Sequence, residues 1–209
     1  MTNPLTLEEA ADVLAEHRED IRDVLKNGWS RWRKLLKADT ELAVIVSSRT
    51  RASLVYDFIR YEAMNRFEDT SGVVISEARG ILLLTFQERL LLRFKKFRGK
   101  GLKTSGIPTQ QARDFAHQTL PGMEELTHIV AGYLPDEAGI DLDRVAITCS
   151  LANEMQWVID LDFGLDDGLG LDDGLGPVGA APMPLAPIDG QGETLVVPKA
   201  DRAEDGRES

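Results

Sequence analysis

One short stretch of this sequence concentrates positive charge. Between Arg89 and Lys103 there are 7 Lys or Arg residues within 15 positions, and no Asp or Glu. They are Arg89, Arg93, Lys95, Lys96, Arg98, Lys100 and Lys103. Cations at this density can neutralise phosphates or the carboxylates of an acidic partner. We predict that these side chains bind nucleic acid or another anionic partner. The alternative is a solvated sheet edge that lysines protect against aggregation.

The predicted order of elements, with a helix, three antiparallel strands, a helix and a strand, raises a second possibility, a degenerate metal-dependent nuclease of the PD-(D/E)xK type. Such a site needs an Asp on one strand and Glu-x-Lys on the next, so that two carboxylates hold Mg²⁺ beside a lysine. The available acids are Glu62, Glu77 and Glu88, and the available lysine is Lys95. Arg93 stands where the motif requires an acid, two residues before Lys95. The nuclease therefore remains an alternative that lacks its motif.

The other reactive side chains form no catalytic pattern. His17, His117 and His128 are far apart and include no i, i+4 pair, so they indicate neither a zinc site nor a base beside a nucleophile. The single cysteine, Cys149, lies in an apolar run, which favours a buried structural thiol. We predict no catalytic, cofactor-binding or metal-binding residue, and no cofactor.

Three short apolar runs surround the basic stretch and must position it. They are residues 73–75, 81–86 and 90–97, with connections at 78–80 and 87–89 that are short enough for antiparallel hairpins. In the third run, alternation places Leu90, Leu92 and Phe94 on one side and Leu91, Arg93 and Lys95 on the other, and we assign Phe97 to the first set. This predicts one core face and one largely cationic face. A helix over 81–97 is the alternative, since Leu favours helices.

The N-terminal region predicts helices over residues 7–37. Thr6 and Glu9 have the spacing of a capping box, and Asn27-Gly28 predicts a break between two helices or a kink in one. Trp29 and Trp32 lie one turn apart. We expect both to be buried, with stacking on bases as the alternative.

A further helix is predicted over 51–67, capped by Ser48 or Thr50 and preceded by an apolar run of undefined type at 42–46. Arg49 and Arg51 lie at its start, where the helix dipole does not favour cations. An anionic partner is one explanation for that placement.

Beyond the basic stretch, the pattern predicts a helix over 110–119 and strands over 126–134, 144–149 and 155–161. Adjacent strands with segregated helices indicate an α+β fold. We expect N-terminal helices, a mainly antiparallel sheet of about six strands and one inserted helix.

The charge of the chain is unevenly divided. The net charge is −11, and the residues after Leu161 contribute −8 of it, from 11 acids and 3 bases. This segment contains GLDDGL twice and then a Pro-rich run, which predicts disorder. We expect a helical arm at 1–41, an α+β core domain at 42–161 and a disordered acidic tail at 162–209. The tail either keeps the protein soluble or competes with an anionic partner for the basic stretch.

Several segments resemble uncharacterised bacterial and prophage proteins encoded beside helix-turn-helix repressors and ImmA/IrrE-like proteins. The segments are LRFKKF (92–97), IPTQQA (107–112), LPGM (120–123), AGYLPD (131–136) and ITC (147–149), and the resemblance covers residues 49–161 without a catalytic motif. It implies a non-enzymatic component of a toxin–antitoxin or phage-defence module. Such a component acts through a protein partner, for example a helix-turn-helix regulator, with nucleic-acid contact on the basic stretch. The lack of a signal peptide or apolar span predicts a cytoplasmic protein without membrane contact.

Overall fold

A computed structural model of the chain describes residues 3–78, 80–104, 109–152 and 154–162. These residues belong to one compact unit, Met1–Gly168. They form helices and a mixed sheet, which confirms the predicted α+β class. The predicted acidic tail lies outside the described residues except for Asp162.

The helices are α1 (Leu7–Val13), α2 (Arg18–Ala38), α3 (Leu42–Ile45), α4 (Ser48–Phe67) and α5 (Gln110–Ala116). The strands are β1 (Val73–Ala78), β2 (Ile81–Phe86), β3 (Leu90–Arg98), β4 (Lys103–Thr104), β5 (Thr127–Pro135), β6 (Leu142–Leu151) and β7 (Glu154–Asp160). The short strand β4 has no counterpart in the sequence prediction, since two residues carry no alternation signal.

The sheet has the order β1-β2-β3-β5-β6-β7, with β4 paired to the end of β3. Neighbouring strands are antiparallel except β3 and β5, which run parallel and are joined through α5. Gly132 of β5 lies opposite Lys95 of β3. A Cβ atom at Gly132 would lie 2.5 Å from Cε2 of Phe97, so the absence of a side chain lets Phe97 pack over β5.

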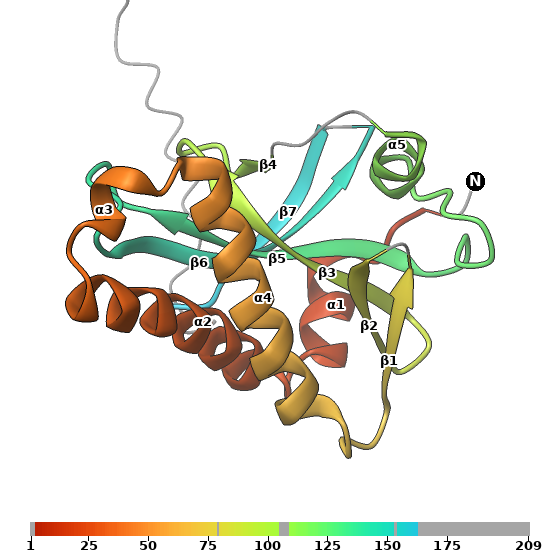
Figure 1. Ribbon diagram of the computed structural model, residues 1–209. Helices are drawn as coiled ribbons and strands as arrows, with labels where there is room; N and C mark the ends of the chain where they lie inside the picture. The colour runs from red at the N-terminus through yellow and green to blue at the C-terminus, as the bar shows by residue number, and fades with distance from the viewer. Residues whose placement is uncertain (1–2, 79, 105–108, 153, 163–209) are drawn as a thin grey trace, which may run out of the picture. The chain divides into compact units, whose positions relative to one another are not determined.

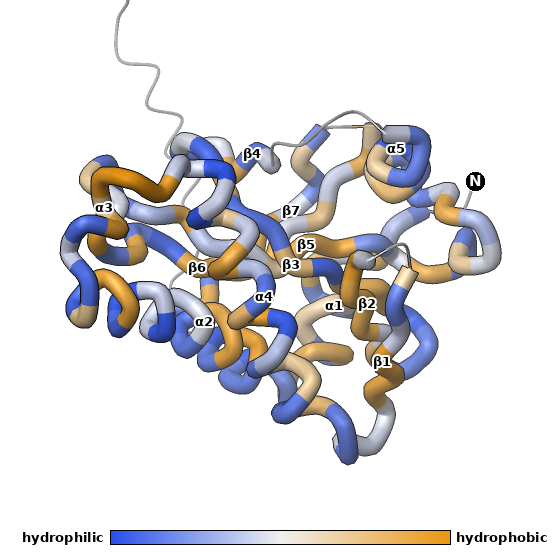
Figure 2. Tube along the Cα trace, viewed as in Figure 1, coloured by the Kyte–Doolittle hydropathy of each residue, from blue (hydrophilic) through white to orange (hydrophobic). Residues whose placement is uncertain are grey.

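Helices cover both faces of the sheet (Figure 1). One face packs against α1, α2 and α4, and we call it the helix side; its core includes Trp32, Phe67 and Phe94. The other face packs against α5, and we call it the α5 side; its core includes Phe97 and Phe115. Figure 2 shows the apolar segments of the central strands enclosed between these layers.

The N-terminal helices differ from the prediction in where they break. α2 continues through Gly28, and the chain instead turns between Val13 and Arg18. A Cβ atom at Gly28 would lie 2.4 Å from Cγ1 of Ile59 in α4. Gly28 therefore serves close helix packing and not a helix end, a distinction that local sequence does not reveal. Trp29 and Trp32 are 3 % and 1 % exposed, which confirms their predicted burial and leaves no indole free to stack on bases.

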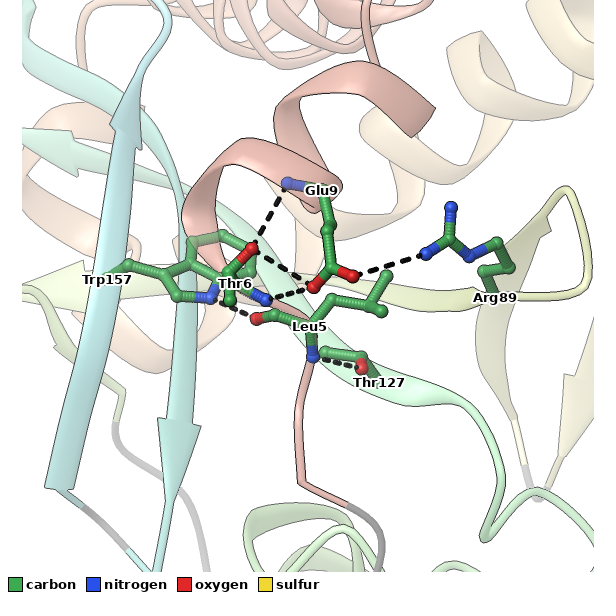
Figure 3. Close-up of polar contacts among 6 residues, drawn as sticks. All are labelled: Leu5, Thr6, Glu9, Arg89, Thr127 and Trp157. Carbon is green, nitrogen blue, oxygen red and sulfur yellow. Dashed lines mark hydrogen bonds and ion pairs between the residues drawn. The ribbon is translucent and has the colours of Figure 1, made fainter.

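Leu5, which precedes α1, is hydrogen-bonded to residues of β5 and β7 (Figure 3). The Leu5 amide donates to Oγ1 of Thr127 over 2.8 Å, and Nε1 of Trp157 donates to the Leu5 carbonyl over 2.8 Å. Thr6 and Glu9 then form the predicted capping box at the start of α1. The N-terminal helices thus share their core with the sheet.

Candidate partner-binding surface

The cations of β3 lie on both sides of the sheet. Lys96 and Arg98 follow Leu92 and Phe94 in the alternation and lie on the helix side, whereas Arg93 and Lys95 lie on the α5 side. Phe97 belongs with Leu91 on the α5 side, so its predicted assignment to the opposite set was wrong.

The predicted division into one core face and one cationic face was also wrong. Leu91 and Phe97 are 0 % exposed on the side that was expected to be cationic. The physical reason is the parallel crossover from β3 to β5, which lays α5 over that face. Both faces of β3 are therefore covered, and only its C-terminal end reaches solvent.

The remaining predicted cations lie at the two ends of this strand. Arg89 precedes β3, and its Nη2 lies 3.9 Å from Oε1 of Glu9 (Figure 3). Lys100 is exposed in the turn after β3. Lys103 is exposed on β4, opposite Arg98.

The structure brings Lys96 and Arg98 together with Arg51 of α4, a group that we call the helix-side cluster. Figure 1 shows the start of α4 beside the turn that follows β3. Partial burial lowers the pKa of Lys96, and the neighbouring charges of Arg51 and Arg98 lower it further. Within the described residues, none of the three forms an ion pair; Nη1 of Arg51 donates to the Gly139 carbonyl over 3.4 Å. Mutual repulsion without a neutralising carboxylate makes the cluster suited to an external anion.

The first turn of α4 adds to this positive potential. The Ser47 hydroxyl caps the helix by accepting from the Thr50 amide over 3.1 Å. The exposed Arg49 adds a positive charge beside the helix N-terminus, whose partial charge is also positive. The sequence did carry a signal for this part of the surface, because it placed two arginines at the start of a helix.

Exposed apolar side chains lie next to the helix-side cluster. In α3, which directly precedes α4, Val44 is 88 % exposed and Ile45 is 70 % exposed. Ile140, which follows the Gly139 that Arg51 contacts, is 57 % exposed. Figure 2 shows α3 as an apolar segment at the surface. Sequence reasoning missed these residues, since an apolar run has the same composition whether it is buried or exposed.

Arg93 lies on the α5 side and is 7 % exposed. Its guanidinium carbon lies 3.7 Å from the centre of the Phe115 ring. Burial lowers the pKa of Arg93 to about 10, so the group stays charged at neutral pH. Burial, and then the charge of Arg93, lowers the pKa of Lys95. Arg93 is therefore buried on the α5 side and cannot join Lys96 and Arg98 in a nucleic-acid contact on the helix side.

Two of the acids considered for a nuclease site, Glu62 and Glu77, pair with arginines and not with Lys95. Glu62 pairs with Arg31, and Oε2 of Glu77 lies 2.6 Å from Nη2 of Arg60 on α4. Glu77 thus faces the helix side, whereas Lys95 lies on the α5 side. Among the residues that the structure describes, no group of three His, Cys, Asp or Glu side chains is placed to hold a metal ion.

Cys149 and His128 are buried and contact backbone carbonyl groups. Cys149 is 0 % exposed, as predicted, and burial raises the pKa of its thiol to about 12. His128 is 1 % exposed, and its Nδ1 and Nε2 lie 3.2 Å and 2.9 Å from the carbonyl oxygens of Phe115 and Met123. These contacts join α5 and the following loop to β5.

Among the described helices, none combines the length and the apolar character required to cross a bilayer. No protein-family model, curated protein or solved structure matches this chain.

Proposed function

We propose that the protein is a non-enzymatic binding component that acts through a protein partner. The helix-side cluster and α3 form the contact surface in this proposal, and the partner contributes an acidic segment with apolar side chains. The observation that carries it is the combination of exposed Val44 and Ile45 with three cations that have no ion pair in the described residues.

Charge and apolarity together favour a protein over a nucleic acid. Phosphate contacts need cations and do not need exposed aliphatic side chains, whereas protein interfaces combine an apolar centre with a polar rim. The resemblance supplies the setting for the proposal, a cytoplasmic toxin–antitoxin or phage-defence module in which the partner is a helix-turn-helix regulator. The nuclease alternative is weakened by the separation of Glu77 from Lys95 across the sheet.

The proposal is tested with a partner captured on the tagged full-length chain from its native host, then identified, purified and titrated by calorimetry. Val44→Ser with Ile45→Ser should weaken binding at least about tenfold, since apolar anchors dominate interfaces. Lys96→Glu with Arg98→Glu should weaken it similarly and reduce its dependence on salt. Lys34→Glu with Lys37→Glu makes the same change of charge on α2 and should leave the affinity within about twofold.

Different results would assign a different function. If the purified partner binds both double variants as it binds the wild type, the proposed surface is wrong. If random-sequence duplex DNA binds with an affinity that the Lys96/Arg98 change abolishes and the Val44/Ile45 change leaves intact, the surface binds nucleic acid. Mg²⁺-dependent cleavage of DNA or RNA that is lost in Glu77→Gln would establish the enzyme.

A further inference from the structure

A second polar site lies on the opposite side of the sheet. A pocket of about 340 Å³ opens between the sheet, the turn into β4, and α5. Its lining includes Arg93, Phe115, His128, Val130, Thr148 and Ser150. We call it the Arg93 pocket. None of these residues belongs to the helix-side cluster, so the site is independent of the proposed function.

Two cations line this pocket, the exposed Lys103 and the buried Arg93, and within the described residues Arg93 has no counter-ion. Nε of Arg93 is buried without a hydrogen-bond partner, and in the described part of the chain its guanidinium forms no ion pair. The Phe115 ring compensates part of the lost hydration through a cation–π contact. Removing a cation from water without a paired anion is strongly unfavourable, so an anion that reached Arg93 would gain a charge-assisted hydrogen bond.

The walls of the pocket are held in place by buried hydrogen bonds. Gln118 is 6 % exposed; its Nε2 donates to the carbonyl oxygens of His128 and Ser150 over 3.0 and 3.1 Å. Its Oε1 accepts from the His128 amide over 2.5 Å. These bonds tie the end of α5 to β5 and β6. The pocket is therefore preorganised, which reduces the entropy lost on binding.

The lining selects a ligand with one charged end and an apolar body. Val130 and Phe115 provide apolar surface near Arg93, and Thr148 and Ser150 provide hydroxyl groups on the β6 side. A guanidinium matches a carboxylate in a planar, bidentate geometry. Phosphate is more highly charged and more strongly hydrated, and it has no apolar group to contact Phe115 and Val130.

We propose that the Arg93 pocket is a binding site for a small carboxylate with an apolar body. The carboxylate pairs with the Arg93 guanidinium, and the apolar body lies against Phe115 and Val130. Occupation of the pocket would neutralise the buried cation and rigidify α5 against the sheet.

The test uses isotopically labelled full-length protein titrated with benzoate, 4-methylpentanoate, inorganic phosphate and the neutral analogue benzamide. Benzoate should produce saturable shifts of the His128 imidazole and Val130 methyl signals, and benzamide should bind at least about tenfold more weakly. Arg93→Met should keep the fold and weaken benzoate binding at least about tenfold. Arg98→Met removes an arginine from the helix side of the same strand and should leave benzoate affinity within about twofold.

A second variant keeps the proposal testable if Arg93→Met does not fold. Ser150→Leu changes a half-buried residue of the lining. It retains Arg93 and should exclude benzoate by filling space. Equal affinity for benzoate and benzamide, unchanged binding in a folded Arg93→Met protein, tighter binding of phosphate than of either carboxylate, or no saturable shift with either carboxylate would each overturn the proposal.

Discussion

The two sides of β3 place the same kind of residue in opposite environments. On the helix side, Lys96 and Arg98 stand at the end of the strand beside Arg51, and Arg98 is exposed. On the α5 side, Arg93 lies under the Phe115 ring and is 7 % exposed. Alternation along a strand decides the side on which a cation lies. The layer that covers that side decides whether the cation contacts solvent or the core.

The largest predicted effect lies at the parallel pairing of β3 and β5. A side chain at Gly132 should disrupt packing on the α5 side of the sheet and not on the helix side. A Cβ atom at Gly132 would lie 2.5 Å from the Phe97 ring and 2.7 Å from the Lys95 carbonyl oxygen. Since backbone cannot move aside cheaply, Gly132→Ala should lower the free energy of unfolding by about 2–3 kcal/mol, measured by urea titration. Gly101→Ala meets no atom within 4 Å and should change it by less than about 0.5 kcal/mol. Equal losses in the two variants would contradict the proposed packing of Phe97 over β5.

The second prediction compares the cations themselves. Arg93→Met removes a buried charge without a counter-ion and keeps a flexible side chain of similar length. We expect the free energy of unfolding to rise by about 1–2 kcal/mol, because the desolvation cost of a lone buried cation exceeds the cation–π contact that is lost. Arg98→Met, on the exposed side, should change it by less than about 0.5 kcal/mol. Urea titration of both variants measures the difference, and a loss of stability in Arg93→Met would show that Arg93 supports the fold.

The stability of the α5 side should depend on pH through the buried His128. Burial lowers the pKa of His128 below its usual 6.5 despite the two nearby carbonyls, and the charge of Arg93 lowers it further. The folded state therefore binds the proton less tightly than the unfolded state. This contribution to the free energy of unfolding is fully present above pH 6.5 and should fall as the pH drops below it.

Urea titrations at about pH 7.5 and pH 5.5 measure this dependence. His128→Gln should show a smaller loss between the two values, because it lacks the imidazole whose pKa burial lowers. The same loss in wild type and variant would place the pH dependence elsewhere in the molecule.

Most elements of the fold were accessible from sequence because their signals are local. The hairpin of β2 and β3 was indicated by two apolar runs of strand length, the second of them alternating, with a short connection at 87–89. The partner of a strand is not a local property. Nothing in residues 90–97 indicated that they pair with residues 127–133 in a parallel register, and the wrong assignment of the two faces followed from that gap.

The candidate sites were accessible only in part for the same reason. The density of cations and the arginines at the start of α4 were visible, and both contribute to the helix-side cluster. The burial of Arg93 depends on Phe115, which comes from an element 22 positions later in the chain. Val44 and Ile45 are exposed because no other described element covers their side chains. The composition of the run does not reveal this.

The attachment of Leu5 between Thr127 and Trp157 affects how the chain is made. During synthesis α1 leaves the ribosome before β5 and β7, because the residues that bond Leu5 lie more than 120 positions later. Contacts of such sequence separation form late and slow the final folding step. The apolar stripes of α1 and α2 therefore lack their sheet until those strands emerge, a period in which a chaperone would protect the nascent chain from aggregation.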